Sequence, residues 1–334
     1  MKKSIALILA ILIMVSLCAC GGGDTTSTDA KAENNKLDGV GSVTESVADN
    51  TLAPTTAPAP TEPSRPVPQN FLFYDETDIA HVMGTRDVGR DEVMSVTFLD
   101  TLKDKPSDAW DASQNKDGSV MAWIDDDGNL FVAGEGGVTA TNCKKLFDNY
   151  YKAEYIDFND CFYTDLVEEM SHMFASCKGL TDLDLSFFNT SKVKYMDEMF
   201  SYSTSLENID LSSFDTSHVF DMDSMFQLTS IESIDLSSFN TKRVNDMSYM
   251  FDYCDDLKTL DLSNFNTANV TDMGDMFSNC ESLTTVDLSS FDFSALESAE
   301  NMFYACKNLT DVCCTITLPE GCKDDGMYKY SAFE

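Results

Sequence analysis

The second half of the chain repeats one pattern of apolar and polar positions every 25 or 26 residues. Asp-Leu-Ser begins at positions 184, 210, 235, 261 and 287, and a Met-Phe pair recurs with its phenylalanine at positions 174, 200, 226, 251, 277 and 303. The shared pattern is V-x-x-M-x-x-M-F-x-x-C-x-x-L-x-x-L-D-L-S-S-F-[DN]-T. A period of roughly 20–29 residues with L-x-x-L-x-L spacing is typical of leucine-rich repeats.

Each repeat contains two kinds of hydrophobic spacing. Apolar and polar residues alternate over 260–263, which predicts a strand with one buried face. Asn266 and Thr267 then offer side-chain oxygens that can cap a helix, and the apolar residues of 270–277 follow helical spacing. A strand and a short helix in every repeat predict an α/β fold, namely a right-handed leucine-rich-repeat solenoid with a strand face and a short-helix face.

We expect this array over residues 143–314, where stacking supplies a core that no single repeat could bury. Residues 143–167 form a degenerate first repeat, and residues 315–334 are a carboxyl-terminal cap or tail. Residues 69–142 precede the array and contain a predicted strand at 95–99 and a predicted hairpin around 125–129. Such a β-containing segment fits a small amino-terminal cap that covers the first repeat.

The abundant methionines, 17 in all, belong mostly to the apolar stripe of the predicted helices, so we expect them to pack in the core. A cysteine column is interrupted by Ser and Thr, which indicates a need for small side chains rather than for thiols. Helices pack ~8–10 Å apart, whereas a disulfide needs Cα atoms within about 7 Å. We therefore expect mostly free thiols and predict no metal site. The column contains Cys177, Ser203, Thr229, Cys254, Cys280 and Cys306.

A polar column accompanies the strands and is our candidate ligand or cation face. It comprises Asp184, Asp210, Asp235, Asp261 and Asp287 with Ser186, Ser212, Ser237, Ser263 and Ser289. Strands ~4.8 Å apart bring these like charges close together, which requires some compensation. One interpretation is a solvated face on which each Asp is hydrogen-bonded locally. The other is a face that binds a ligand or a cation, with Ca²⁺ as the cation considered; no other cofactor is predicted.

The amino terminus has the features of an export signal. Lys2 and Lys3 precede an apolar run from Ile5 to Val15, which is too short to span a membrane comfortably. Leu-Cys-Ala-Cys, ending at Cys20, resembles the bacterial lipobox, which implies that Cys20 carries lipid and becomes the first mature residue. We therefore expect residues 1–20 to be a lipoprotein signal peptide, the other interpretation being an ordinary cleaved signal.

Residues 21–68 are rich in Gly, Thr, Ser and Ala and hold six of the eight prolines. Such composition predicts a disordered Thr/Ser/Pro-rich tether, which fully extended would reach roughly 150 Å.

The repeat, seen as Asp-Leu-Ser-Ser-Phe-Asp-Thr-Ser-His-Val over 210–219, resembles that of BspA-like leucine-rich-repeat surface proteins. The segments 108–111, 118–123 and 133–138 are similar to the region that precedes the repeats in that family. The resemblance spans roughly residues 70–314. It implies a bacterial, exported protein associated with adhesion to host matrix proteins or other cells.

The net charge excludes one class of partner. The net charge is −35, with 57 acidic and 22 basic residues, and this excludes nucleic acid as a partner because phosphate binding needs clustered Lys and Arg. No hydrolase, metalloprotease, P-loop or dinucleotide-binding motif occurs, so we do not expect an enzyme.

We therefore expect an adhesin, lipid-anchored on the extracellular side of the bacterial membrane, whose partners are an extracellular protein or glycan and, through Cys20 alone, the membrane. The alternatives are a cell-envelope polysaccharide-processing enzyme or its accessory, and a ligand-free structural spacer.

Overall fold

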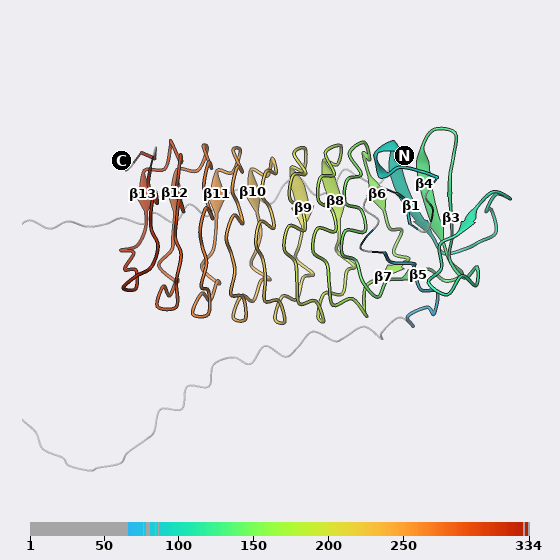
Figure 1. Ribbon diagram of the computed structural model, residues 1–334, viewed down its shortest axis with the longest axis horizontal. Coiled ribbons are helices and arrows are strands. Elements are labelled where there is room, and N and C mark those ends of the chain that lie inside the picture. The colour runs from blue at the N-terminus through green and yellow to red at the C-terminus, as the bar shows by residue number, and fades with distance from the viewer. Residues whose placement is uncertain are drawn as a thin grey trace, which may run out of the picture. The chain divides into compact units, whose positions relative to one another are not determined.

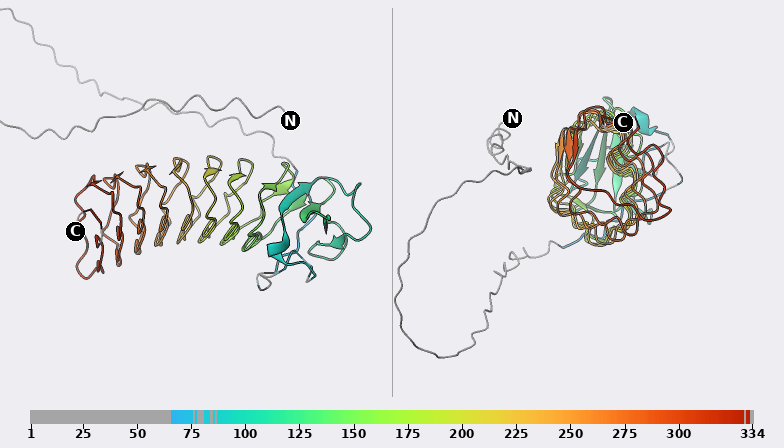
Figure 2. Two further views of the ribbon diagram at one scale, coloured as in Figure 1. Left: turned by 90° about the horizontal axis from the view of Figure 1, so that it is seen from above. Right: turned by 90° about the vertical axis from the view of Figure 1, so that its left-hand side faces the viewer.

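The repeats stack on one another as a row of coils (Figure 1). The computed structural model describes residues 66–332 except 76, 78–80, 84, 86 and 330. Viewed end on, the successive coils superimpose around a common interior (Figure 2). The expected signal peptide, 1–20, and nearly all of the expected tether, 21–68, lie outside the described residues.

Parallel pairing joins each coil to the next. Strand pairing links Asp182 to Asn208 and Ser233 to Thr259, and isolated bridges on the other side link Glu169 to Tyr195 and Tyr195 to Asp221. The partners are therefore separated by about one repeat, and the expectation that the repeats stack is confirmed.

The regular elements are short because each coil turns several times within one repeat. In chain order they are η1 (Arg90–Glu92), β1 (Ser95–Leu99), β2 (Trp110–Asp111), β3 (Met121–Ile124), β4 (Asn129–Ala133), β5 (Val138–Thr139), β6 (Ile156–Asp157), β7 (Phe162–Tyr163), β8 (Asp182–Asp184), β9 (Asn208–Asp210), β10 (Ser233–Ile234), β11 (Thr259–Leu260), β12 (Thr285–Val286) and β13 (Asp311–Val312).

The strand expected at 95–99 and the hairpin expected around 125–129 are present as β1 and β3–β4. They belong to a five-stranded sheet with the order β2-β3-β4-β1-β6. Its last strand, β6, lies in the degenerate first repeat and pairs in parallel with β1. The amino-terminal sheet therefore continues directly into the coil stack, and Phe98 contacts Phe147 of the first coil with ring centroids 6.2 Å apart.

The prediction of a short-helix face is wrong. In the described residues the 270–277 segment and its equivalents form tight turns rather than α-helix. One residue of each segment and one residue shortly after it adopt positive φ, for example Asp275 at 53° and Asn279 at 60°, which an α-helix does not allow.

The hydrogen bonds explain why turns replace the helix. The amides of Met273, Asp275 and Phe277 donate to carbonyls of the following coil at 2.8–3.0 Å, while those of Met276 and Ser278 donate within their own coil. A helix would direct all of these amides to its own carbonyls and leave the neighbouring coil unpaired. Apolar residues at helical spacing still point inward, because the turns bring the same positions to the core.

Phenylalanine rings form the centre of the stack. From Phe174 to Phe303 the rings of successive coils stack with centroids 5.5–5.8 Å apart and planes within 9° of parallel. Phe147 extends this ladder at one end, and Tyr328 extends it at the other. The methionines of the same stripe, such as Met222 and Met225, are fully buried beside it, as their spacing predicts.

The cysteine column has a hydrogen-bonding role that the sequence did not reveal. The Cys280 and Cys306 thiols donate to Phe carbonyls of the preceding coil at 3.1 and 2.9 Å, and the Ser203 hydroxyl makes the equivalent bond at 2.7 Å. The position therefore accepts Cys or Ser because both supply a small donor. Within the described residues, the cysteines of this column, Cys177, Cys254, Cys280 and Cys306, are free thiols.

Candidate functional site: two faces of the coil stack

The strand face carries the predicted Asp and Ser columns. All ten residues are exposed, so the structure brings them to one face of the stack. In each coil the Asp Oδ1 accepts a hydrogen bond from the amide of the Ser two residues later. The Ser212 amide donates to Asp210 and the Ser263 amide donates to Asp261, both at 2.9 Å. Each Asp thus holds the turn that ends its own strand.

These local bonds also lower the pKa of three carboxyl groups in the column. Hydrogen bonding by Ser212 lowers the pKa of Asp210 below its usual value, and Ser237 does the same for Asp235. The backbone and side chain of Ser263 lower the pKa of Asp261, although neighbouring Asp235 opposes the shift. At these three positions the local bonds therefore outweigh the repulsion between coils and favour the ionised carboxylate without a bound cation.

Lysines pair with glutamates on both sides of the coils. Next to the strands, Lys258 pairs with Glu232 of the preceding coil at 2.7 Å. On the opposite side, beside Tyr195, Lys194 pairs with Glu168 of the preceding coil at 2.6 Å. All four side chains are well exposed, and ion pairs of that kind contribute little to stability. No group of three or more His, Cys, Asp or Glu side chains suited to a metal occurs in the described residues.

The opposite side of the stack, which we call the turn face, was not predicted as a site. It consists of residues 169–176, 195–202, 221–228, 246–253, 272–279 and 298–305. These six described segments contain no Lys or Arg but ten carboxylates, namely Glu169, Asp197, Glu198, Asp221, Asp223, Asp246, Asp252, Asp272, Asp275 and Glu300.

Crowding and burial make several of these groups hard to ionise. Desolvation raises the pKa of Asp221, Asp252 and Asp275, and neighbouring carboxylates add to each shift. The effect is largest at Asp223, whose pKa burial raises to about 6. Hydroxyl groups of Ser224 and Ser248 donate to this carboxylate at 3.1 Å, yet they offset only part of the desolvation.

The turn face also exposes aromatic side chains. Tyr195, Tyr202, Tyr249 and Tyr253 retain 41–47% of their accessible surface. Within residues 169–305 these are the large hydrophobic side chains most open to solvent. A partial signal was present in the sequence, since Tyr202 and Tyr253 occupy equivalent turn positions of their repeats, but the helical interpretation of those positions concealed it.

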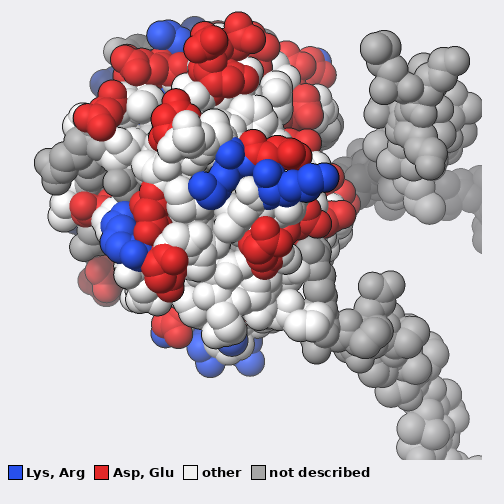
Figure 3. All heavy atoms as spheres, turned by 90° about the vertical axis from the view of Figure 1, so that its right-hand side faces the viewer, with Lys and Arg blue, Asp and Glu red and all other residues white. Residues whose placement is uncertain are grey.

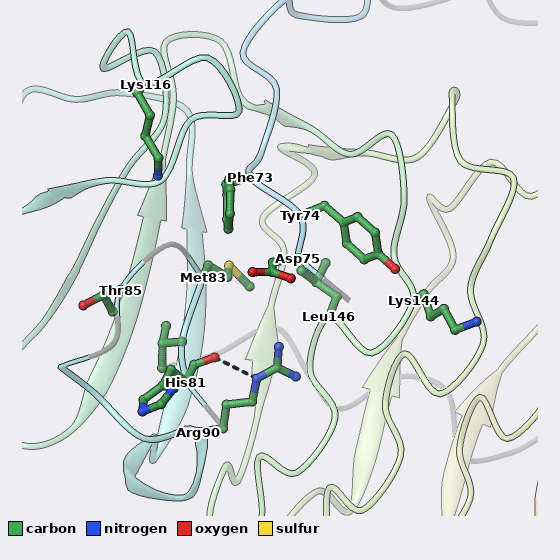
Figure 4. A pocket seen from close by; sticks show the side chains of 11 residues that line it. Phe73, Tyr74, Asp75, His81, Met83, Thr85, Arg90, Lys116, Lys144 and Leu146 are labelled. Carbon is green, nitrogen blue, oxygen red and sulfur yellow. Dashed lines mark hydrogen bonds between the residues drawn. The ribbon is translucent and has the colours of Figure 1, made fainter. Parts of the chain in front are cut away.

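A pocket of about 190 Å³ lies beside the first coil (Figure 4). Its lining consists of Phe73, Tyr74, Asp75, His81, Val82, Met83, Thr85, Arg90, Lys116, Lys144 and Leu146. Basic and acidic side chains both occur at this end of the molecule (Figure 3).

The best-defined polar group of this pocket is structural. The Arg90 guanidinium, only 6% exposed, donates to the His81 carbonyl at 2.8 Å and to the Asp148 carbonyl at 3.1 Å. These bonds connect the segment before β1 with the first coil, so Arg90 joins the cap to the stack.

The anchoring residue predicted from the sequence, Cys20, lies outside the described residues. The part of the chain that the structure describes contains no helix capable of crossing a bilayer.

Comparison with solved structures finds two leucine-rich repeat proteins. One, from Bacteroides ovatus, is 18% identical over 55% of this chain with a TM-score of 0.31, and this chain spans about half of it, 54%. The other, from Eubacterium ventriosum, is 14% identical over 65% of this chain and 94% of its own length, with a TM-score of 0.31. No curated protein matches the chain.

The repeats themselves match a family description. Two overlapping segments, 141–232 and 227–315, match the family described as "Mycoplasma protein of unknown function, DUF285", and together they cover more than half of the chain. The matched residues coincide with the coils that carry both the strand face and the turn face. The chain is therefore a member of the DUF285 family.

Proposed function

We propose that this protein is a lipid-anchored binding protein, displayed on the extracellular side of the bacterial membrane, that attaches the cell to an extracellular protein or glycan. The observation that carries the proposal is the set of half-exposed tyrosines on the turn face. Tyrosine is enriched at protein interfaces because it combines a large apolar surface with a polar hydroxyl and loses little entropy on binding.

The arrangement of the coils supports this function. Stacked coils give a broad, repeating surface on which neighbouring side chains are held at fixed spacing by backbone pairing. Such surfaces are the usual binding surfaces of repeat proteins. The strand face, with its regular Asp and Ser columns, is the second surface on which a ligand can be sought.

Attachment and anchoring can be tested in the producing bacterium. Deletion of the protein should reduce attachment to immobilised matrix proteins or to a glycan array, and the wild-type gene should restore it. Cys20→Ser should abolish labelling of the protein by radioactive palmitate and release the protein from the membrane fraction. If deletion leaves attachment unchanged, the proposal is contradicted. The alternatives are then an enzyme or accessory that acts on polysaccharide, or a structural spacer.

A further inference from the structure

Three turn-face residues form a continuous apolar row across consecutive coils. Tyr202, Leu228 and Tyr253 occupy the same position of their repeats, and each amide donates to a carbonyl of the following coil at 2.8–2.9 Å. These backbone hydrogen bonds between coils place the three residues next to one another. Tyr202 and Tyr253 remain 46% and 47% exposed, and Leu228 between them is partly exposed.

The row occupies a strained backbone position. The three residues have φ values of 60°, 58° and 56°, a left-handed conformation that disfavours bulky side chains by about 1 kcal/mol each. Equivalent positions of other coils hold Ser176 and Asn279, which are small or tolerate that conformation. The two tyrosines leave nearly half of their surface in water at positions where Ser and Asn also serve, so the fold does not require a ring there.

The carboxylates of the turn face favour a cationic ligand over a neutral one. The Asp252 carboxylate next to the row is itself buried, and it accepts hydrogen bonds from Gln227 at 2.9 Å and from Asn279 at 3.3 Å. Other carboxylates of the turn face, Glu198, Asp223 and Asp275, are partly exposed and available to a ligand. A neutral ligand laid over the row would desolvate such carboxylates without neutralising them. A cationic ligand would neutralise them and could also place its charge over a tyrosine ring.

We propose that the row Tyr202–Leu228–Tyr253 binds a Lys- or Arg-rich segment of a partner protein. The basic side chains lie over the two rings and pair with turn-face carboxylates, while their aliphatic stems cover Leu228. The inference rests on the proposed function, since it names the partner class of that binding protein. It differs from the sequence-based expectation, which placed the candidate ligand face on the Asp column.

The test uses the purified full chain in detergent micelles and a fluorescent dodecapeptide of alternating Arg and Gly as the probe. The double variant Tyr202→Asn/Tyr253→Asn removes the rings but keeps every charge, and Asn suits the backbone conformation, so the fold should survive. The control variant Asp210→Asn/Asp235→Asn/Asp261→Asn removes three charges from the strand face. Fluorescence anisotropy gives the Kd, and thermal unfolding checks both folds.

We expect the tyrosine variant to bind the peptide about fivefold to twentyfold more weakly, as two exposed cation–π contacts imply. The control should change the Kd less than threefold, and wild-type binding should weaken as salt is raised. A loss of affinity in the control with none in the tyrosine variant would indicate general charge attraction and overturn the inference. Displacement of the peptide by neutral dextran, without salt dependence, would overturn it in favour of a glycan.

Attachment assays separate the two proposals. If deletion abolishes attachment but Tyr202→Asn/Tyr253→Asn leaves it intact, the protein is a binding protein and the row is not its site. If deletion has no effect, the proposed function itself fails.

Discussion

The Thr216 hydroxyl of one coil makes two hydrogen bonds to the backbone of Asn240 in the next, accepting from its amide at 2.7 Å and donating to its carbonyl at 3.1 Å. Thr216 is completely buried, so neither backbone group has water as a substitute. The same pair of bonds is made by Thr164, Thr190, Thr241 and Thr267.

Replacing this hydroxyl should destabilise the stack. Thr216→Val leaves a buried amide and a buried carbonyl without partners, and we expect the free energy of unfolding to fall by about 2–4 kcal/mol. Thr216→Ser keeps the hydroxyl and should cost less than about 1 kcal/mol. Urea unfolding measures both, and a Val variant as stable as the Ser variant would show that the column is dispensable.

The phenylalanine ladder should be most sensitive at its centre. Phe226→Ala removes ring contacts with coils on both sides and should destabilise the fold by about 3–5 kcal/mol. Tyr328→Ala, at the end of the ladder, removes contact with one ring and should cost clearly less. Thermal unfolding compares the variants, and a greater loss at Tyr328 would contradict the expected order.

The pKa of Asp223 predicts a pH-dependent penalty. Its pKa, raised by burial to about 6, lies above the unfolded value of 3.8, so ionisation opposes folding and stability falls as the pH rises from about 4 to 6. Asp223→Asn should stabilise the protein at pH 7 by about 1–2 kcal/mol, with the gain disappearing below about pH 4.

Asp210→Asn is the matched control for that experiment. Hydrogen bonds from Ser212 lower the pKa of Asp210, so its ionised form supports folding, and this support is lost as the pH falls through the folded-state pKa. The variant should therefore be less stable than wild type at pH 7. Unfolding midpoints measured from pH 3 to pH 8 should show opposite signs at the two positions, and the same sign would refute the assignment.

The thiols should divide into two classes by their reactivity toward alkylating reagents. Burial raises the pKa of Cys254 and Cys306 to about 12, so these thiols are neutral as well as inaccessible, whereas Cys313 is exposed. Iodoacetamide should modify Cys313 in the folded protein and the other two only after unfolding, as peptide mass mapping would report. Rapid labelling of Cys254 in the folded protein would argue against this packing.

Cys254→Ser should preserve stability because Ser203 serves the same position in another coil.

The Asp column should not require calcium. Each carboxylate is already held by the turn that follows it, as Asp235 is by the Ser237 amide at 2.9 Å. We expect a chelator to leave the melting temperature unchanged. A rise of several degrees on adding calcium, reversed by chelation and absent from Asp235→Asn/Asp261→Asn, would instead establish a cation on this face.

The sequence predicted the stacking and the core because both follow from periodicity. Phe226 and Met222 recur at one spacing and therefore meet their equivalents in every coil. The strand at 95–99 was equally legible, since its alternation is local. The helix prediction failed at 270–277 because turns and helices place the same positions inward, and hydrogen bonding to a neighbouring coil does not affect the spacing.

The turn-face row was concealed for a related reason. Tyr202, Leu228 and Tyr253 are set side by side by backbone hydrogen bonds between coils, and a helix at these positions would have directed those amides to its own carbonyls. Likewise, Thr267 was expected to cap a helix, whereas its hydroxyl bonds to Asp292 of the next coil, 25 residues away.

The ring-on-ring ladder has a consequence for how such a protein changes through evolution. Every interior coil presents the same ring to both neighbours, about 5.5 Å apart, so a duplicated repeat could enter the stack without altering the contacts on either side. Recombination between repeats would then lengthen or shorten the molecule by whole coils. The surface offered to a partner would grow in fixed increments while the chemistry of each increment stayed constant.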